Sequence, residues 1–347
     1  MKVIVLGAGV VGVATAYYLA RDGHQVSLVD RNQGAALEAS YANGGQLSYS
    51  YVAPLADPAV WPKLVPWLLS PSSPVRFRPQ LDARQWRWCL QFLAACRSLR
   101  SAETTRHLLR LGHASRRLMH ELLADDPALD FAHANSGKLV VYRDAAALES
   151  ARRQVDFQQR LVRDDDYRQE VLDRAACMAI EPALDGLRGE IVGGVHTASE
   201  DTADCYRFSG ELLDRILAAS PENRCFFATS INGLSVRQGE VVGVETSAGR
   251  LEADAYVLAA GSDSERLARR AGLSLPIYPL KGYSLTAPIS DPEAAPTLSV
   301  TDFQRKIVYA RLAGRLRVAG IADIGGYDGS IAPRRLAMLL GEARGAF

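Results

Sequence analysis

The residues with the clearest chemical potential lie close to the amino terminus. Gly7-Ala8-Gly9-Val10-Val11-Gly12 has the order G-x-G-x-x-G, and Asp30 follows about twenty residues later. In this order Gly7 allows a tight turn, Gly9 lets the backbone approach a pyrophosphate, and Gly12 lets a helix pack closely on a strand. The carboxylate of Asp30 can accept hydrogen bonds from ribose hydroxyls. These residues predict a dinucleotide site.

The flanking sequence predicts the elements that position these groups. Val3-Ile4-Val5-Leu6 is a continuous apolar run, typical of a strand buried on both faces of a parallel sheet. A helix is predicted to about Asp22, with Gly23 placed to end it, and Gln25 to Val29 predicts a second strand leading to Asp30. The free amides at the helix start would face the phosphates. The alternative, glycines that serve packing alone, is disfavoured by the complete strand–helix–strand order.

Bulk composition bounds the class of protein. The 347 residues predict about two domains. The hydrophobic content of 48% and net charge of +1 are those of a soluble globular protein and give no reason to expect a nucleic-acid partner. Five cysteines without a C-x-x-C pair indicate reduced thiols. Because residues 1–6 already read as a strand, we expect no signal peptide and a cytoplasmic location.

Two further segments were candidates for binding. Val60 to Leu69 contains two tryptophans and few charges, so it predicts either packing on the protein itself or a peripheral contact with the inner face of the plasma membrane. His107, His113 and His120 are spaced six and seven residues apart, which is not the spacing of helical metal ligands. They are interpreted as surface residues, and no metal site is predicted.

The order of elements predicts an α/β fold with a discontinuous Rossmann-like domain and an inserted, antiparallel-sheet substrate domain. Gln85 to Leu123 reads as helix with one possible break, Cys205 to Ala219 as helix, and Cys225 to Ile231 as one strand. The expected division is 1–84 and 191–275 for the nucleotide-binding domain, 85–190 for a helical and substrate-domain insertion, and 276–347 for the antiparallel sheet. An inserted domain can cover a permanently bound ring system, so this order favours a flavin over a diffusible nicotinamide.

Four stretches together carry a resemblance to a known family. "GAGVVGVATAYYLARDGHQVSLVD", "GAALEASYANGGQLS", "ADAYVLAAGS" and "IYPLKGYSLT" resemble the FAD-dependent D-amino acid oxidase-like superfamily, and within it the bacterial D-amino acid dehydrogenases. The resemblance runs to about residue 335 and implies FAD as the cofactor. Full-length members usually continue with R-P-x-T-P-D-G and G-H-G type segments, so we expect the C-terminal closing segment to be missing from a chain that ends at Phe347.

The resemblance also implies roles for individual residues. Asp30 would bind the adenosine ribose with Arg31 beside it, Ile231 would lie near the adenine, and Tyr283 would orient the substrate as the candidate catalytic residue. The cofactor-binding set implied in full is Val3, Gly7, Ala8, Gly9, Val10, Val11, Gly12, Asp30, Arg31, Ser40, Asn43, Gly44, Gln46, Ile231, Ala260 and Gly261. Lys281 and Gly282 belong to the segment expected to lead toward the flavin ring and the substrate.

The implied reaction is oxidation of a D-amino acid such as D-alanine to a 2-oxo acid and ammonia, by hydride transfer from Cα to flavin N5. Such a reaction would serve D-amino acid catabolism, with electrons passed to an acceptor other than oxygen, for example a respiratory quinone. Two alternatives stay open from the sequence. One is an oxygen-using oxidase of glycine, sarcosine or a related amine, and the other is a truncated, non-catalytic flavin-binding remnant.

Overall fold

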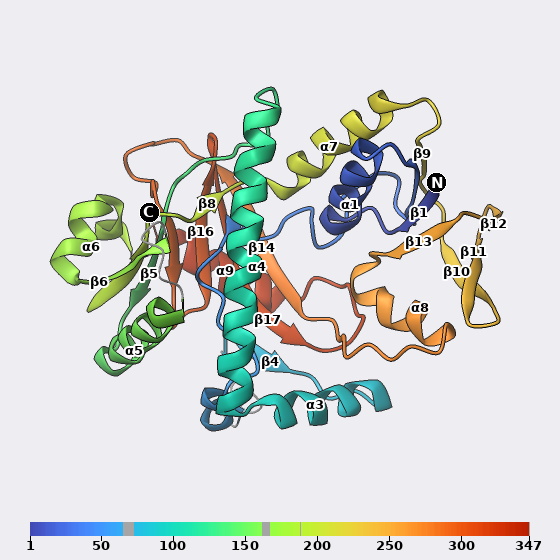
Figure 1. The fold of residues 1–347 in the computed structure, drawn as a ribbon. Coiled ribbons are helices and arrows are strands. Elements are labelled where there is room, and N and C mark those ends of the chain that lie inside the picture. The colour runs from blue at the N-terminus through green and yellow to red at the C-terminus, as the bar shows by residue number, and fades with distance from the viewer. Residues whose placement is uncertain (65–72, 162–166, 188, 347) are drawn as a thin grey trace. The chain divides into compact units, whose positions relative to one another are not determined.

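The computed structural model describes residues 1–64, 73–161, 167–187 and 189–346, which fold into two compact units (Figure 1). The first unit comprises Met1–Asn43, Leu129–Phe131 and Asp204–Pro279. The second comprises Gly44–Ala128, Ala132–Ala203 and Leu280–Phe347. Each unit is assembled from separate stretches of the chain, and the predicted discontinuous α/β fold is confirmed.

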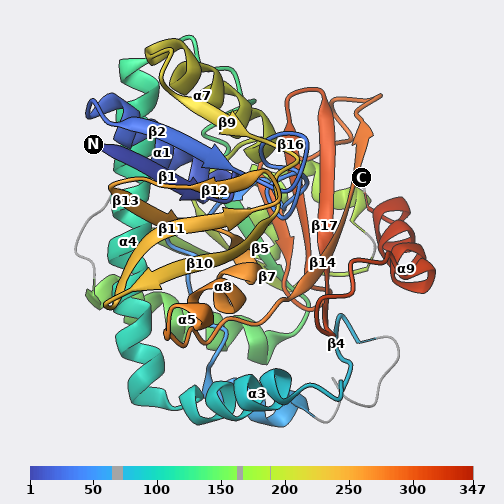
Figure 2. The same ribbon diagram turned by 90° about the vertical axis from the view of Figure 1, so that its right-hand side faces the viewer.

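A parallel sheet forms the centre of the first unit. The order of its strands is β13-β1-β2-β9, and every neighbouring pair is parallel (Figure 2). Its elements are β1 Lys2–Leu6, α1 Val10–Arg21, β2 Gln25–Val29, α7 Cys205–Ala219, β9 Arg224–Phe226, β10 Ile231–Arg237, β11 Glu240–Thr246, β12 Gly249–Leu251, β13 Ala255–Leu258, the 3-10 turn η4 Gly261–Asp263 and α8 Ser264–Arg270.

The core of this unit follows from the apolar strands of the sequence. Val5, Val26 and Leu28 are completely buried, as expected for strands covered on both faces. Helix α1 turns the small or branched residues Gly12, Val13 and Ala16 toward the sheet, which allows it to lie close to the strands. The second face of the sheet packs against the antiparallel strands β10 and β11.

One predicted strand of this unit is wrong. Cys225 to Ile231 was expected to be continuous, but β9 ends at Phe226 and β10 begins at Ile231. Between them Ala228 adopts a positive φ of 51°, and its N–H donates to the carbonyl of Asn32. The chain turns here because it leaves the parallel sheet and enters the antiparallel one.

The second unit contains most of the helices found among the described residues, together with a large sheet. Its strands are β3 Gln46–Leu47, β4 Val75–Phe77, β5 Lys138–Tyr142, β6 Gln169–Asp173, β7 Gly193–Thr197, β8 Asp201–Thr202, β14 Lys281–Pro288, β15 Ser299–Asp302, β16 Ile307–Leu312 and β17 Arg315–Ile324. Its helices are α3 Ala83–Ala95, α4 Ser98–Asp125, α5 Ala145–Leu161, α6 Arg174–Ile180 and α9 Pro333–Arg344, with 3-10 turns η1 Pro58–Lys63 and η3 Pro182–Gly186.

The large sheet is mixed rather than purely antiparallel. Among the described residues its order is β14-β17-β16-β15-β5-β7-β6, with β4 added beside β17. Most neighbours are antiparallel, but β15 pairs with β5 and β17 pairs with β4 in parallel. The buried core includes Leu139, Val300, Ile307, Tyr309 and Leu339. The antiparallel pattern predicted for 278–322 is therefore confirmed, and the parallel contacts come from segments distant in the sequence.

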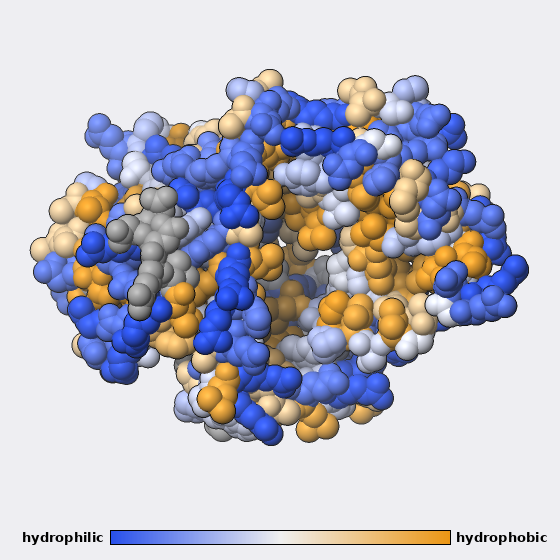
Figure 3. All heavy atoms as spheres, in the orientation of Figure 1, coloured by the Kyte–Doolittle hydropathy of each residue, from blue (hydrophilic) through white to orange (hydrophobic). Residues whose placement is uncertain are grey.

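The predicted helix break falls between α3 and α4. Helix α3 ends at Ala95, Cys96 leaves the helical region with a ψ of 62°, and α4 resumes at Ser98. Over α4 the surface is largely hydrophilic (Figure 3). No helix in the described part of the chain is long and apolar enough to span a bilayer. Of the tryptophan-rich segment 60–69, residues 65–69 lie outside the described residues, and Trp61 is half exposed.

Candidate functional site

The glycine segment forms a tight turn at the carboxyl end of β1. Gly7 has a φ of +106°, and a Cβ at this position would lie 2.5 Å from the carbonyl oxygen of Ala259. A Cβ on Gly12 would lie 1.9 Å from the carbonyl oxygen of Gly7. Both distances are far below contact, so only glycine allows α1 to start this close to the strand. The predicted role of Gly12 in close helix–strand packing is confirmed.

The amino end of α1 presents backbone groups rather than charged side chains. Its N-cap residue is Gly9, which has no side chain to cap the helix, and the first turn contains no acidic residue. Val10 N–H donates to the Oγ of Ser40 over 3.0 Å, which brings Ser40 to the helix start. Val11 is exposed and Ala8 is buried. No carboxylate within the first turn of α1 therefore competes with an anion for the positive end of the helix dipole.

Asp30 lies at the carboxyl end of β2, beside the same turn. Its Oδ2 accepts a hydrogen bond from Ala8 N–H at 2.8 Å, and its Oδ1 accepts one from Asn32 N–H at 2.8 Å. The neighbouring Arg31 points to other partners, forming ion pairs of 2.8 Å with Glu38 and with Asp263. The hydrogen bond to Glu38 raises the pKa of Arg31 above its ordinary value.

The strand order reverses between β13 and β1, and the predicted residues gather at this point. Ala259 N–H donates to the carbonyl of Leu6, so Ala260 and Gly261 follow β13 directly beside the glycine turn. In open parallel sheets ligands bind outside the carboxyl ends of the strands, where the order reverses. Two predicted residues lie elsewhere in this unit: Val3 is near the opposite, amino end of β1, and Ile231 begins β10, paired with Thr246.

The remaining predicted cofactor residues lie around Asn43, where the first stretch of the first unit, Met1–Asn43, ends. Asn43 is exposed and is the last residue of that segment, whereas Gly44 and Gln46 belong to the second unit. The amide nitrogen of Gln46 hydrogen-bonds the hydroxyl of Ser299 and, at 3.3 Å, that of Thr301. Gln46 belongs to β3, and these hydrogen bonds hold its side chain against β15 of the large sheet.

A buried lysine lies beside Ser299, and sequence reasoning missed it. Lys138 pairs with Ser299 across β5 and β15, is 2% exposed, and donates to Ser48 Oγ at 2.6 Å. Burial lowers the pKa of Lys138 to about 8, although nearby Glu200 opposes the shift. The carboxylate of Glu200 accepts hydrogen bonds from the backbone N–H groups of Tyr49 and Ser50. The sequence did contain one signal of this buried charge, because Lys138 begins an otherwise apolar strand segment, Lys138–Tyr142.

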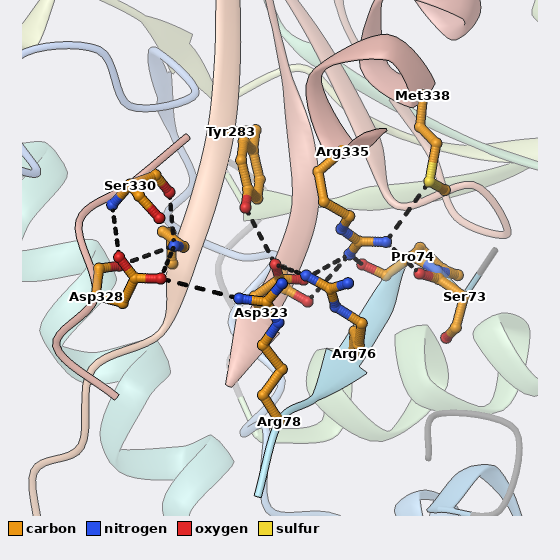
Figure 4. Close-up of polar contacts among 12 residues, drawn as sticks. Ser73, Pro74, Arg76, Arg78, Tyr283, Asp323, Asp328, Ser330, Arg335 and Met338 are labelled. Carbon is orange, nitrogen blue, oxygen red and sulfur yellow. Dashed lines mark hydrogen bonds and ion pairs between the residues drawn. The ribbon is translucent and has the colours of Figure 1, made fainter. Parts of the chain in front are cut away.

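Tyr283, the candidate catalytic residue, belongs to a buried ionic network (Figure 4). Its hydroxyl donates to Asp323 Oδ2 at 3.0 Å. Asp323 lies between two guanidinium groups, with Arg76 Nη2 at 2.7 Å and Arg335 Nη2 at 3.0 Å. Burial, with the hydrogen bond to Asp323, raises the pKa of Tyr283. The phenol therefore stays protonated at neutral pH and can act as a hydroxyl group but not as a base.

Arg335 and Lys281 hold the surrounding backbone. Arg335 is 1% exposed and donates to the carbonyls of Ser73 and Pro74, which ties α9 to the segment before β4. Lys281 Nζ donates to the carbonyl oxygens of Asp328 and Ser330 at 2.8 and 2.9 Å. The ammonium group of Lys281, a residue of the segment expected to lead toward the flavin ring and the substrate, is thus engaged by the loop after β17.

Comparison with protein families decides the class of this nucleotide site. The model of the DAO family, described as FAD dependent oxidoreductase, matches residues 2–347. The chain belongs to this family. The cofactor of the DAO family is FAD, as the sequence predicts.

Individual relatives agree with the family. The DAO-family chain is 47% identical over its whole length to "D-amino acid dehydrogenase 2" of Ralstonia nicotianae, covering 81% of that protein. It is 45% identical, again over its whole length, to "D-amino acid dehydrogenase 2" of Pseudomonas aeruginosa, covering 80% of it. Glycine oxidase from Geobacillus kaustophilus superposes with a TM-score of 0.73 at 19% identity, covering 99% of this chain and 78% of that one. The last likeness shows the shared fold.

The first unit of this DAO-family protein fits the ADP half of FAD. A Cβ added at Gly9 would meet only Ser40 Oγ, at 3.4 Å, so the backbone at the helix start is open to close approach. The start of a helix preceded by this glycine turn suits a pyrophosphate, and Asp30 is an acceptor beside it. The residues that would hold this half are Gly7–Gly12, Asp30 and Ser40.

The interpretation of the three histidines as surface residues is correct for His107 alone. His107 is well exposed on α4. His113 stacks on Tyr167 with ring centroids 3.5 Å apart. His120 lies 3.0 Å from Asp201, a fully buried carboxylate that also contacts His133. Because β8 follows α4 by many residues, no spacing rule within one helix could reveal this cluster.

Proposed function

We propose that this protein is an FAD-dependent dehydrogenase that oxidises D-amino acids to 2-oxo acids and ammonia. The observation that carries the proposal is the 47% identity, over the whole chain, to a protein named D-amino acid dehydrogenase. The glycine turn, with its open helix start and adjacent acidic residue, supports the cofactor half of the proposal.

In the proposed reaction the protein mainly binds and orients. The chemistry that FAD supplies when bound is acceptance of the hydride that leaves the substrate Cα. The turn Gly7–Gly12 and the start of α1 would hold the pyrophosphate, and Asp30 would accept hydrogen bonds from the ribose. Tyr283 contributes a neutral hydroxyl whose orientation is set by Asp323. The substrate amine must be neutral for its lone pair to assist departure of the hydride, after which water converts the imino acid to the 2-oxo acid.

The reduced protein is proposed to pass its electrons to an acceptor other than oxygen, such as a respiratory quinone. The name "dehydrogenase" of the relatives supports this choice. We further propose a peripheral membrane contact through the segment that includes the half-exposed Trp61. A quinone analogue should reoxidise the reduced protein faster than dissolved oxygen does. Co-sedimentation with anionic phospholipid vesicles should fall in Trp61→Ser if the membrane contact exists.

The decisive experiment is an anaerobic titration of the flavin-loaded protein with D-alanine and, separately, with L-alanine. Bleaching of the flavin absorption by D-alanine alone is the expected result. Bleaching by L-alanine alone would overturn the substrate assignment. Bleaching by glycine or sarcosine, with stoichiometric peroxide on exposure to oxygen, would indicate an amine oxidase. A yellow protein that no amine bleaches would indicate a non-catalytic flavin-binding protein.

A further inference from the structure

Three side chains of the second unit, two histidines close in sequence and one distant aspartate, lie close together. His120 lies near the end of α4, His133 follows that helix, and Asp201 is in β8. Asp201 Oδ2 is 3.0 Å from His120 Nε2 and 3.3 Å from His133 Nε2. One potential ligand atom of each residue lies within 4.8 Å of those of the other two. Neither the cofactor assignment nor the proposed reaction uses these residues.

We propose that His120, His133 and Asp201 bind a divalent transition-metal ion, with Zn²⁺ as the reference ion. Two imidazole nitrogens and one carboxylate oxygen are a donor set that suits Zn²⁺ and Fe²⁺, whereas Mg²⁺ prefers oxygen ligands alone. The proposal does not depend on which substrate is oxidised, because none of these three residues is assigned to the cofactor or to the proposed reaction.

The distances between the donor atoms fit this coordination. Ligands about 2.0–2.1 Å from a tetrahedral Zn²⁺ are about 3.3 Å from one another. The two nitrogen–oxygen distances, 3.0 and 3.3 Å, are therefore close to the edge of such a tetrahedron. The two imidazole rings are nearly perpendicular, at 86°, so their nitrogens approach the point from different directions.

Burial and the surrounding hydrogen bonds also fit a metal site. The Asp201 side chain is 0% exposed, His133 is 13% exposed and His120 is 33% exposed, which leaves a solvent-facing side for a water ligand. Tyr49 OH donates to Asp201 Oδ2 at 3.0 Å, a supporting bond of the kind that orients ligating carboxylates. Asp201 Oδ1 is buried without a hydrogen-bond partner among the described residues. A cation at this carboxylate would compensate that buried negative charge.

The ion would join the end of α4 and the segment that follows it to a strand that is far away in sequence. It would connect the end of α4 to β8, and β8 pairs with β3, the strand that carries Gln46. The site is therefore expected to be structural. It would stabilise the pairing of β8 with β3 near the start of the second unit, rather than take part in hydride transfer.

The test is direct metal binding to untagged, flavin-loaded protein after chelator treatment and dialysis. Zn²⁺ is titrated in competition with a chromophoric chelator, and bound metal is counted by elemental analysis. We expect one equivalent of Zn²⁺, a higher apparent melting temperature on binding, and no competition from Mg²⁺. Co²⁺ should give the visible difference spectrum of a tetrahedral complex.

Three variants test whether Zn²⁺ binds at these residues and not elsewhere on the protein. Each of His120→Gln, His133→Gln and Asp201→Asn should weaken Zn²⁺ binding at least tenfold. His107→Gln is the matched control on the exposed side of α4 and should bind as the parent does. His120→Gln is the variant to rely on if the buried substitutions fail to fold, because His120 is partly exposed; its circular dichroism and flavin content should match the parent. Less than about one tenth of an equivalent of Zn²⁺ in the parent, or parental affinity in His120→Gln, would overturn the proposal. Neither result depends on whether D-alanine reduces the flavin.

Discussion

The glycine turn of the first unit and the interior of the second unit arrange their polar groups in opposite ways. The turn offers backbone amides from residues that are adjacent in sequence, and its special requirement is the absence of side chains at Gly7 and Gly12. The second unit instead buries charged side chains brought together from distant segments. Asp323 with Arg335 and Lys138 near Glu200 are two examples.

The difference shows how each region gains specificity. Backbone amides bind an anion with little dependence on pH, and one local motif suffices to encode them. Buried charges need complete partners, because an unpaired charge in the interior is costly. Each long-range partner therefore fixes which segments of the second unit may pack together. The following substitutions test this contrast.

Asp323→Ala should have the largest effect, because it leaves Arg335 and Arg76 without their shared carboxylate. Arg335 is 1% exposed, so its charge would be left buried. We expect a loss of about 3–5 kcal/mol in the free energy of unfolding, measured by urea titration. Asp328→Ala, at an exposed aspartate of the same region, should shift the midpoint far less. Equal shifts for both would mean that the network is not important for stability.

Gly12→Ala should be the most damaging single change in the glycine turn. The added Cβ would lie 1.9 Å from a backbone oxygen, so α1 must move away from β1. A loss of about 3 kcal/mol is expected, together with weaker flavin retention. Gly210→Ala in α7 is the control, because a Cβ there meets nothing within 4 Å. It should be neutral or slightly stabilising.

Lys138→Met should reveal the buried charge of the second unit through the pH dependence of stability, which the uncharged glycine turn does not have. Below about pH 8 Lys138 is charged in both folded and unfolded protein, so folding carries the cost of burying the charge. Above pH 10.5 it is neutral in both states and that cost disappears. The stability of the parent relative to Lys138→Met should therefore rise by about 3 kcal/mol between pH 7 and pH 10.5.

Urea titrations across this pH range measure the difference directly. Lys2→Met, at an exposed position of β1, controls for the general effect of removing a lysine. A difference between parent and Lys138→Met that is constant with pH would show that the ammonium group is not desolvated in the folded protein.

Asp30→Ala should have the smallest effect, and the quantity that tests the proposed cofactor site is the affinity for FAD, because the substitution also removes the hydrogen bonds from Ala8 and Asn32. Removing the ribose acceptor is expected to weaken FAD binding by about 1–3 kcal/mol, or roughly 5- to 100-fold in Kd. Asp30→Asn, which keeps an acceptor oxygen, should lose less. Fluorescence titration of the flavin-free protein with FAD provides the measurement. Parental affinity in Asp30→Ala would show that the ribose assignment is wrong.

Sequence reasoning worked best where neighbouring residues determine the outcome. The apolar run before Gly7 predicted β1, the stretch from Gln25 to Val29 predicted β2, and one possible break was predicted in the helix from Gln85 to Leu123 without its position. It failed at Cys225 to Ile231, because the turn at Ala228 depends on a hydrogen bond to Asn32, almost two hundred residues away. His120 was misjudged for the same reason, since its partner Asp201 lies in another element.

The sequence by itself determined the parallel sheet, the glycine turn and the family, because strand burial and backbone conformation depend on residue types close along the chain. Only the tertiary structure decided that Tyr283 meets Asp323, that Lys138 is buried beside Ser48, and that two histidines share one carboxylate. Those contacts depend on which segments pack together. That choice is made by the burial of many side chains at once and is not encoded in any short pattern.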